Sequence, residues 1–275
     1  MDSITFFWRQ IVEIYQQVFS VLRKNPIIYF LFIWIGILDL IALVLLFLAP
    51  SPPVSYLLAP IIRTFWSDQY LHYPDNFLLL PKLLGHAHFL ISTVIGVFVT
   101  GLVIKQIEGD WSGERATTIS SMQLVLKKYV ALVVAWLISY GAYVASLKLL
   151  MAVLPPIFPA LQLLVSFLLA VAVQAILAFF LPALIVLNQG FLRSLWEAIR
   201  FGAQNILVTS ALILVPVLLA LCVSVLKLYT PFFVQVHPEL VLWVLTAGIV
   251  VSVLVDLWVT SSVTLLYLKA RQGKS

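Results

Sequence analysis

Charged residues are scarce in this sequence. Only 10% of its 275 residues are charged, whereas 63% are hydrophobic, and soluble domains are usually about a quarter charged. A soluble protein of this length could not bury so much apolar surface, but side chains in lipid already lie in an apolar solvent. The composition therefore excludes a soluble protein and predicts a single integral membrane domain over residues 1–275.

Several other features are absent. Cys222 is the only cysteine, which excludes an intrachain disulfide and a cysteine metal cluster. The net charge is +5, but there is no basic stripe and no aromatic RNA-binding motif, so a nucleic-acid partner is excluded. No paired carboxylates and no Ser, His and Asp set in a suitable context are visible. We therefore predict a protein that is not an enzyme and has no cofactor.

Six apolar segments are long enough to cross a bilayer, which needs about 20 residues. We expect an all-α polytopic fold, because helices satisfy their own backbone hydrogen bonds in lipid. Pro182 is expected to kink or end the fourth span, and Pro216 to bend the fifth. The predicted spans are Ile27–Ala49, Leu83–Lys105, Tyr129–Leu154, Phe158–Leu187, Ile206–Leu228 and Leu240–Leu268.

An amphipathic segment precedes each odd-numbered span: the N-terminal stretch, about 117–128 and about 191–204. Apolar residues recur at helical spacing on one face of each, and such helices lie in the membrane interface. The chain then has three repeat-like units of an in-plane helix and two spans, at 3–110, 115–189 and 190–272. A tight turn at Pro155-Pro156-Ile157 joins the two spans of the second unit.

Basic residues sort to one side of the predicted spans. Twelve Lys and Arg lie on the side of the termini and three on the other, namely Arg63, Lys82 and Lys227. Lys148, near the end of a span, completes the total of 16. The positive-inside rule then places both termini in the cytoplasm.

The outer connector at 50–82 is long and rich in proline and aromatic residues but has few charges. We expect it to lie on the outer leaflet or over the helix bundle. Together with the amphipathic segments it supplies the predicted lipid or partner contacts: Trp8, Phe65, Trp66, Tyr70 and Trp196.

The pattern Ser194-Leu195-Trp196-Glu197-Ala198, followed by Asn205 at the next span, supports a resemblance. With three in-plane helices that each lead into a hairpin of spans, the chain resembles the membrane domain of some glycerophosphodiester phosphodiesterases and a related group of uncharacterised six-span bacterial proteins. The resemblance implies a bacterial inner-membrane protein of this architecture. The catalytic barrel that some of these proteins carry is absent, so no catalytic residue is transferred.

Four polar residues inside spans are candidates for function: Asp39, Lys148, Gln174 and Asp256. Asp39 and Asp256 could form an ion or proton path, or each could be neutralised by a partner, such as Asp39 by Lys148. Lys148 could instead extend to the outer interface, and Gln174 is expected to bond between helices.

The histidines near the second span give a weak metal-site signal. His86 and His88 follow His72 and Asp75 in the sequence, but this spacing is not typical of a metal site. Histidines near a membrane surface are more often interfacial residues, so we predict no metal.

The favoured hypothesis is a non-enzymatic inner-membrane scaffold, assembly factor or accessory subunit. It would bind lipid and another membrane protein or a second copy of itself. The alternative is a transporter or channel for a lipid-like or small solute that uses Asp39 and Asp256. A lipid-acting membrane enzyme ranks last, because no acid–base or metal constellation is visible.

Overall fold

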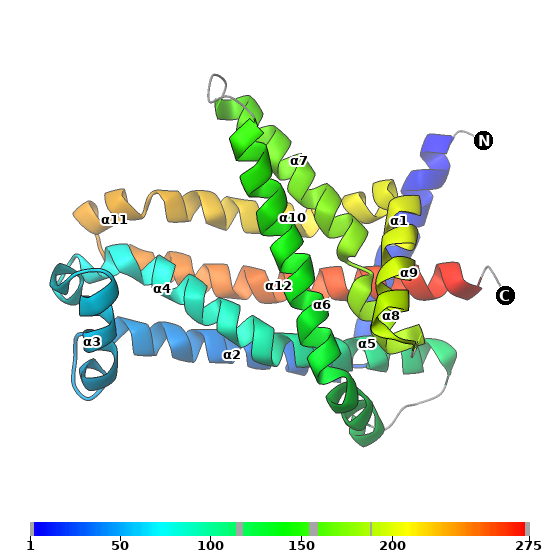
Figure 1. The fold of residues 1–275 in the computed structure, drawn as a ribbon, viewed down its shortest axis with the longest axis horizontal. Coiled ribbons are helices and arrows are strands. Elements are labelled where there is room, and N and C mark those ends of the chain that lie inside the picture. The colour runs from blue at the N-terminus through cyan, green and yellow to red at the C-terminus, as the bar shows by residue number, and fades with distance from the viewer. Residues whose placement is uncertain (1–2, 114–117, 154–158, 188, 273–275) are drawn as a thin grey trace. The chain divides into compact units, whose positions relative to one another are not determined.

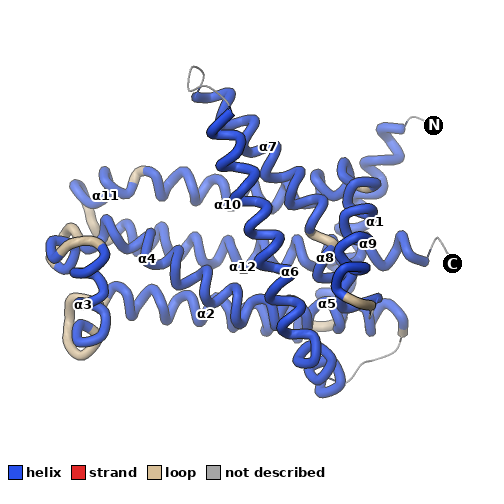
Figure 2. Tube along the Cα trace, viewed as in Figure 1, coloured by secondary structure: helices blue, strands red, loops and turns tan. Residues whose placement is uncertain are grey.

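The computed structural model describes residues 3–113, 118–153, 159–187 and 189–272. Over these residues the chain forms helices and no β-strand (Figures 1 and 2). Six helical segments are long and apolar enough to cross a membrane. The predicted all-α polytopic fold is therefore confirmed.

The helices follow one another with short connections. In chain order they are α1 (Ser3–Lys24), α2 (Ile27–Phe47), α3 (Ser55–Phe65), the 3-10 helix η1 (Asp68–Leu71), α4 (Asn76–Ile91), the π-helical turn η2 (Ser92–Gly96), α5 (Val97–Ser112), α6 (Thr118–Val153), α7 (Pro159–Leu177), α8 (Phe180–Leu187), α9 (Phe191–Gln204), α10 (Ile206–Leu228), α11 (Thr230–Val236) and α12 (Leu240–Gln272).

Three spans are longer than the sequence predicted, the second and third by the most; the sixth extends to Gln272. Helices α4 and α5, joined through η2, make one segment of 37 residues, so the connector helix α3 is followed by a span that already begins at Asn76. Helix α6 is continuous over 36 residues. The prediction of a separate amphipathic helix at 117–128 is wrong, because α6 runs without a break from Thr118 into the span. At 1.5 Å per residue α6 is about 54 Å long, well beyond the hydrocarbon thickness of about 30 Å.

Pro182 divides the fourth span as predicted. Helix α7 ends at Leu177 and α8 begins at Phe180. The break includes Ala178, whose carbonyl would clash with the proline ring in a continuous helix. Helix α10 runs through Pro216 without a break. The predicted turn at 155–157 lies outside the described residues.

The chain divides into two compact units. The first comprises Met1–Tyr29, Gly96–Pro216 and Leu257–Ser275, and the second comprises Phe30–Ile95 and Val217–Asp256. This division does not follow the three repeat-like units expected from the sequence. Each unit is described by itself.

In the first unit, α1 packs part of its apolar face against protein. Ile11, Ile14, Val18 and Leu22 are buried. The Tyr15 hydroxyl donates to the Leu212 carbonyl at 3.2 Å. The Lys269 ammonium lies 2.8 Å from Glu13, and its hydrogen bond and charge lower the pKa of that carboxyl. The rest of the apolar face of α1, which was predicted to lie on lipid, is exposed and includes Trp8, Val12 and Phe19.

Helix α9 also belongs to the first unit, and it lies directly against α7. A Cβ atom at Gly202 would lie 2.3 Å from the Ile176 carbonyl oxygen, so only glycine allows this approach. On the opposite side, Leu192, Trp196 and Ile199 are exposed. Their spacing of four and three residues places them in one stripe along the helix.

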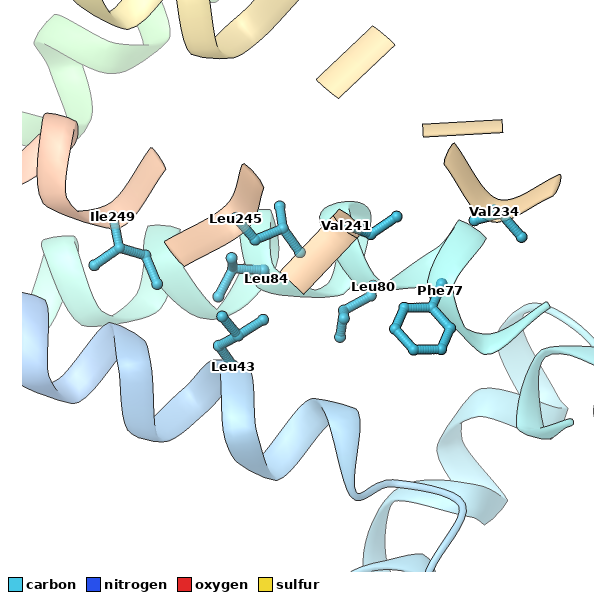
Figure 3. Close-up of a cluster of buried hydrophobic side chains, with 8 residues drawn as sticks. All are labelled: Leu43, Phe77, Leu80, Leu84, Val234, Val241, Leu245 and Ile249. Atoms are coloured by element: carbon cyan, nitrogen blue, oxygen red, sulfur yellow. The ribbon is translucent and has the colours of Figure 1, made fainter. Parts of the chain in front are cut away.

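The second unit has an apolar core between α2, α4, α11 and α12. Side chains from these helices point toward one another in Figure 3. The cluster consists of Leu43, Phe77, Leu80, Leu84, Val234, Val241, Leu245 and Ile249. We call it the outer plug, because α11 and the nearby ends of α2 and α4 adjoin the two connectors that the charge pattern predicts to lie on the outer side.

Candidate functional site

Asp39 is a buried carboxylate in the middle of a membrane-spanning helix. Its exposed fraction is 1%, and it is the thirteenth of the 21 residues of α2. The helical rise places it about 18 Å from one end of α2 and about 12 Å from the other. A charge at this depth is costly, so such residues are usually paired and often functional.

His88 of α4 supplies the partner. Its Nδ1 lies 2.9 Å from Asp39 Oδ2, while Asp39 Oδ1 is buried and has no hydrogen bond to any described residue. When Asp39 is ionised, Nδ1–H donates to Oδ2. The pair is therefore only half satisfied, with one carboxylate oxygen free to hold a proton or accept another bond.

Ser92 extends this pair into a chain of three side chains. Its Oγ lies 3.3 Å from His88 Nε2, so the hydroxyl donates to the ring when Nδ1 carries the ring proton. Ser92 is also the first residue of the π-helical turn η2, which is the only such turn among the described residues. Turns of this kind occur often at functional sites in α-helices.

The order Asp39–His88–Ser92 matches that of a hydrolytic triad, in which aspartate holds Nδ1 and serine donates to Nε2. The depth of the site argues against hydrolysis. Lipid ester groups and water lie near the edges of the hydrocarbon, about 15 Å from its centre, whereas Asp39 is within about 3 Å of the middle of α2. Holding and passing a proton needs neither group, so the arrangement favours proton binding.

Asp256 is a second carboxylate near the pair. It interacts electrostatically with His88 and with Asp39. Its spacing from Leu245 and Ile249 places it on the same face of α12 as these two plug residues. Asp256 is nevertheless exposed. The same face of α12 is therefore covered by protein at Leu245 and Ile249 and uncovered at Asp256.

The outer plug lies on one side of all three charged residues. Leu43 is one turn beyond Asp39 in α2, and Leu84 is one turn before His88 in α4. Ile249 is two turns before Asp256 in α12. In each helix the plug residue is nearer to the connector along the chain, so within this unit buried apolar side chains lie between the polar site and the connectors.

The other intramembrane candidates are not part of this site. The partner of Asp39 is His88, not Lys148 as the sequence suggested. Lys148 is exposed on α6. Gln174 is exposed on α7 and is not buried between helices.

The described residues contain no group of three or more metal-binding side chains. The histidines of the weak metal signal have different neighbours. His72 Nε2 lies 3.5 Å from Asp68 Oδ2, and the His86 ring lies 6.3 Å from the Trp66 ring, centre to centre. Only His88 reaches the buried site.

The predicted lipid or partner contacts fall into two groups. Trp8, Phe65 and Trp196 are exposed, with exposed fractions of 59%, 72% and 67%. Trp66 and Tyr70 instead pack against a second apolar cluster, formed by Ala49, Ala59, Ile62, Leu71 and Leu79. The first group is therefore the more exposed of the two, whereas Trp66 and Tyr70 are partly buried.

The sequence identified Asp39 and Asp256 as candidates, but His88 was considered only as part of a weak metal-site signal and Ser92 was missed. The available signal was the spacing of His88 and Ser92, because residues four apart share a helix face. Both are also polar residues in an otherwise apolar span that follows the first connector. Nothing in the sequence showed that this face meets Asp39, which is 49 residues away from His88.

Comparison with known proteins leaves the site to be interpreted from its own chemistry. The multi-pass membrane architecture follows from the six apolar helices, and the polar site follows from the contacts described above. No family model, curated protein or solved structure matches this chain.

Proposed function

We propose that this chain is a membrane transporter that takes up and releases a proton at the Asp39–His88 pair. One observation carries the proposal: a carboxylate with 1% exposure, in the middle of a span, is bonded through one oxygen only. Histidine titrates near neutral pH, and chains of Asp and His inside spans are typical of proton relays.

The position of the pair supports transport more than a purely structural role. Coupling sites of transporters commonly lie near the bilayer midplane, which is where Asp39 lies along α2. A structural contact between α2 and α4 could be made by apolar side chains, as in the outer plug. Insertion scales assign about 2.5–3.5 kcal/mol to a central Asp, so retaining one suggests a function.

The proposed setting is the bacterial inner membrane, with both termini in the cytoplasm. The excess of Lys and Arg on the terminal side supports this orientation, and the resemblance to six-span bacterial proteins supports the setting. Asp256 then lies toward the cytoplasm, and the outer plug separates Asp39 from the other side.

Solute-dependent proton movement tests the proposal. Purified protein is reconstituted in vesicles that contain a pH-sensitive dye, and small carboxylates, amines, amino acids and sugars are added outside. We expect at least one class to change the internal pH faster than in protein-free vesicles. Asp39→Asn should abolish the change, because the amide cannot release a proton.

Lys148→Gln is the matched control, since it removes an exposed charge from another span. It should leave the proton movement unchanged. Rates equal to those of protein-free vesicles for every solute class would refute the proposal, as would undiminished movement with Asp39→Asn.

The second candidate is a non-enzymatic scaffold, assembly factor or accessory subunit that binds lipid or another membrane protein. The exposed stripe Leu192, Trp196 and Ile199 favours it, together with the exposed Arg193 and Arg200 on the same helix. Basic amphipathic helices bind anionic lipid surfaces. Native mass spectrometry tests this: retention of anionic phospholipid should fall in Trp196→Ala, and equal retention would count against it.

A further inference from the structure

We propose that helix α3 of the first connector lies flat in the membrane interface, with one stripe of its surface in contact with the acyl chains of the bilayer. The stripe consists of Leu57, Ile61 and Phe65, and the partner is the lipid leaflet on the connector side. This placement is independent of proton transport, because α3 contributes no residue to the polar site.

One surface of α3 packs on the ends of two spans. Ala59 and Ile62 are buried, and they form a cluster with Ala49, Leu71 and Leu79. Ala49 comes two residues after the end of α2, and Leu79 is in the first turn of α4. These contacts fix α3 at the level where both spans reach the connector.

A second surface of α3 is apolar and exposed. Leu57, Ile61 and Phe65 are spaced by four residues, which places them in one stripe along the helix. Leu57 is 76% exposed, and Ile61 and Phe65 are exposed as well. Water is an unfavourable neighbour for this stripe, because apolar area in contact with water costs free energy.

The third surface of α3 is polar. Tyr56, Arg63 and Thr64 are exposed, and the Arg63 guanidinium lies 2.6 Å from Asp68. Successive residues of a helix are about 100° apart, so the buried, apolar and polar surfaces each take roughly a third of the circumference. A helix that lies on protein, with lipid on one side and water on the other, needs these three surfaces.

Helix α2 shows the depth at which α3 lies. Its 21 residues extend over about 32 Å, close to the hydrocarbon thickness of about 30 Å. Because the cluster that holds α3 includes Ala49, just after the end of α2, it lies at the edge of the hydrocarbon. Figure 1 shows α3 running across the end of α2 and not continuing along it, as expected of a helix in the interface plane.

Aromatic and basic residues of the connector match this depth. Tyr56 is in the first turn of α3 and Trp66 directly follows its last residue. The Lys82 ammonium lies 5.8 Å from the centre of the Trp66 ring. Tryptophan and tyrosine gather at membrane–water interfaces, and lysine side chains extend to the same level. The connector therefore has the composition of an interfacial segment.

Lipid suits the stripe better than a protein partner does. Stable protein interfaces usually involve about 20–30 residues on each side, whereas the stripe has three residues and adjoins the polar surface of the same helix. Acyl chains can cover a narrow apolar stripe without matching its shape. They also surround the exposed side chains of the adjoining span, such as Ile41 and Leu45 of α2.

Spin-label accessibility tests the apolar and polar surfaces separately. Cys222→Ala removes the only cysteine, and single labels are then attached to Leu57→Cys, Ile61→Cys and Thr64→Cys. The protein is reconstituted in phosphatidylcholine vesicles. Collisions of the label are measured with oxygen, which concentrates in hydrocarbon, and with a water-soluble nickel chelate. We expect the oxygen-to-nickel ratio to be severalfold higher at positions 57 and 61 than at position 64, because lipid excludes the chelate.

Two further positions calibrate the measurement. Ile41→Cys is the lipid reference, since Ile41 is exposed on the span α2. Gln69→Cys is the water reference, since Gln69 is exposed in η1. If Leu57→Cys or Ile61→Cys fails to fold, Phe65→Cys supplies another position in the stripe. All the labelled side chains are exposed, so the label replaces no buried group.

Nickel collisions at positions 57 and 61 equal to those at position 69 would place the stripe in water and overturn the proposal. Collisions with both reagents below those of the two references would mean that protein covers the stripe, which overturns it as well. A ratio at position 64 equal to that at position 41 would show α3 immersed on every side and would also overturn it. Proton movement enters none of these readouts, so the transport proposal can fail while the placement of α3 stands, and the reverse.

Discussion

Asp39 Oδ2 and His88 Nδ1 are 2.9 Å apart, and this contact joins two spans separated by the whole first connector. It is polar in a segment where nearly every other helix contact is apolar. Since Asp39 Oδ1 has no hydrogen-bond partner among the described residues, the pair gives less stability than a fully bonded one. The same feature makes it available for proton exchange.

His88→Ala should destabilise the protein more than removal of both partners. The single change leaves Asp39 buried without its only side-chain partner, and breaking a buried pair in this way costs about 3 kcal/mol. The double variant Asp39→Leu with His88→Leu replaces the pair with apolar groups and should recover most of that loss. Unfolding in detergent, followed by circular dichroism, gives both values.

Proton movement should be lost in both of these variants, although only one is unstable. A double variant less stable than His88→Ala would contradict the view that Asp39 is an unpaired buried acid in the single variant. Ser92→Ala is a milder companion, because it removes only the hydroxyl that faces Nε2.

The sequence predicted the helices better than their contacts. Long apolar runs identify spans because the bilayer imposes a length, and Pro182 identified the break before α8 because its ring excludes a continuous helix. The amphipathic pattern at 117–128 was misleading, since the same pattern occurs in an interfacial helix and in the end of a long span such as α6. Periodicity describes one helix face and does not distinguish these cases.

The site was only half predictable for a related reason. An acidic residue in a span is evident from the sequence, so Asp39 and Asp256 were candidates. Their neighbours depend on how the spans are rotated against each other. Close packing at Gly36, whose Cβ position is 2.9 Å from Val253 Cγ2, brings α2 and α12 together in a way that no local pattern encodes.

Gly202→Ala should strongly destabilise the first unit. The added methyl would meet the Ile176 carbonyl oxygen at 2.3 Å and its Cα at 2.7 Å, and backbone atoms cannot move aside as a flexible side chain does. We expect a loss of about 3 kcal/mol, in the range of severe overpacking, measured by thermal unfolding in detergent.

Gly141→Ala is the control for that change. Gly141 also lies within a helix, but a Cβ atom there would have no neighbour within 4 Å. Alanine is the better helix former by about 1 kcal/mol, so this variant should be as stable as the wild type or more so. Equal effects of the two substitutions would show that α9 does not lie this close to α7.

The connector should contain a carboxyl that titrates at unusually low pH. The Arg63 guanidinium donates a hydrogen bond to Asp68 at 2.6 Å. This bond, and after it the hydrogen bond with His72, holds the pKa of Asp68 below its ordinary value of 3.8. The ionised form is favoured in the folded state. The contribution to stability is therefore present above the unfolded pKa and is lost as the pH falls through the folded one.

Arg63→Gln should raise the pKa of Asp68 toward 3.8, as measured by NMR titration of the carboxyl carbon. Lys82→Gln is the control, since Lys82 lies over the Trp66 ring and not against Asp68. An unchanged pKa in Arg63→Gln would mean that the guanidinium does not hold this carboxyl. Because both side chains of the pair are largely exposed, global stability should change little.

Thiol labelling tests whether the face of α12 that bears Asp256 is open to water beyond the outer plug. The exposed Cys222 is first replaced by Ala, and single cysteines are then introduced as Asp256→Cys and Leu245→Cys. Leu245 is 1% exposed within the plug, whereas Asp256 is exposed on the same face of α12. In vesicles, a charged thiol reagent should modify position 256 from the side of the termini and leave position 245 unmodified from both sides.

Leu84→Ala, which opens a cavity in the plug, should speed labelling at 245 from the connector side. An unreactive cysteine at 256 would place that side chain in lipid, where a carboxylate could not exchange protons with water, and the proton path through Asp256 would have to be abandoned.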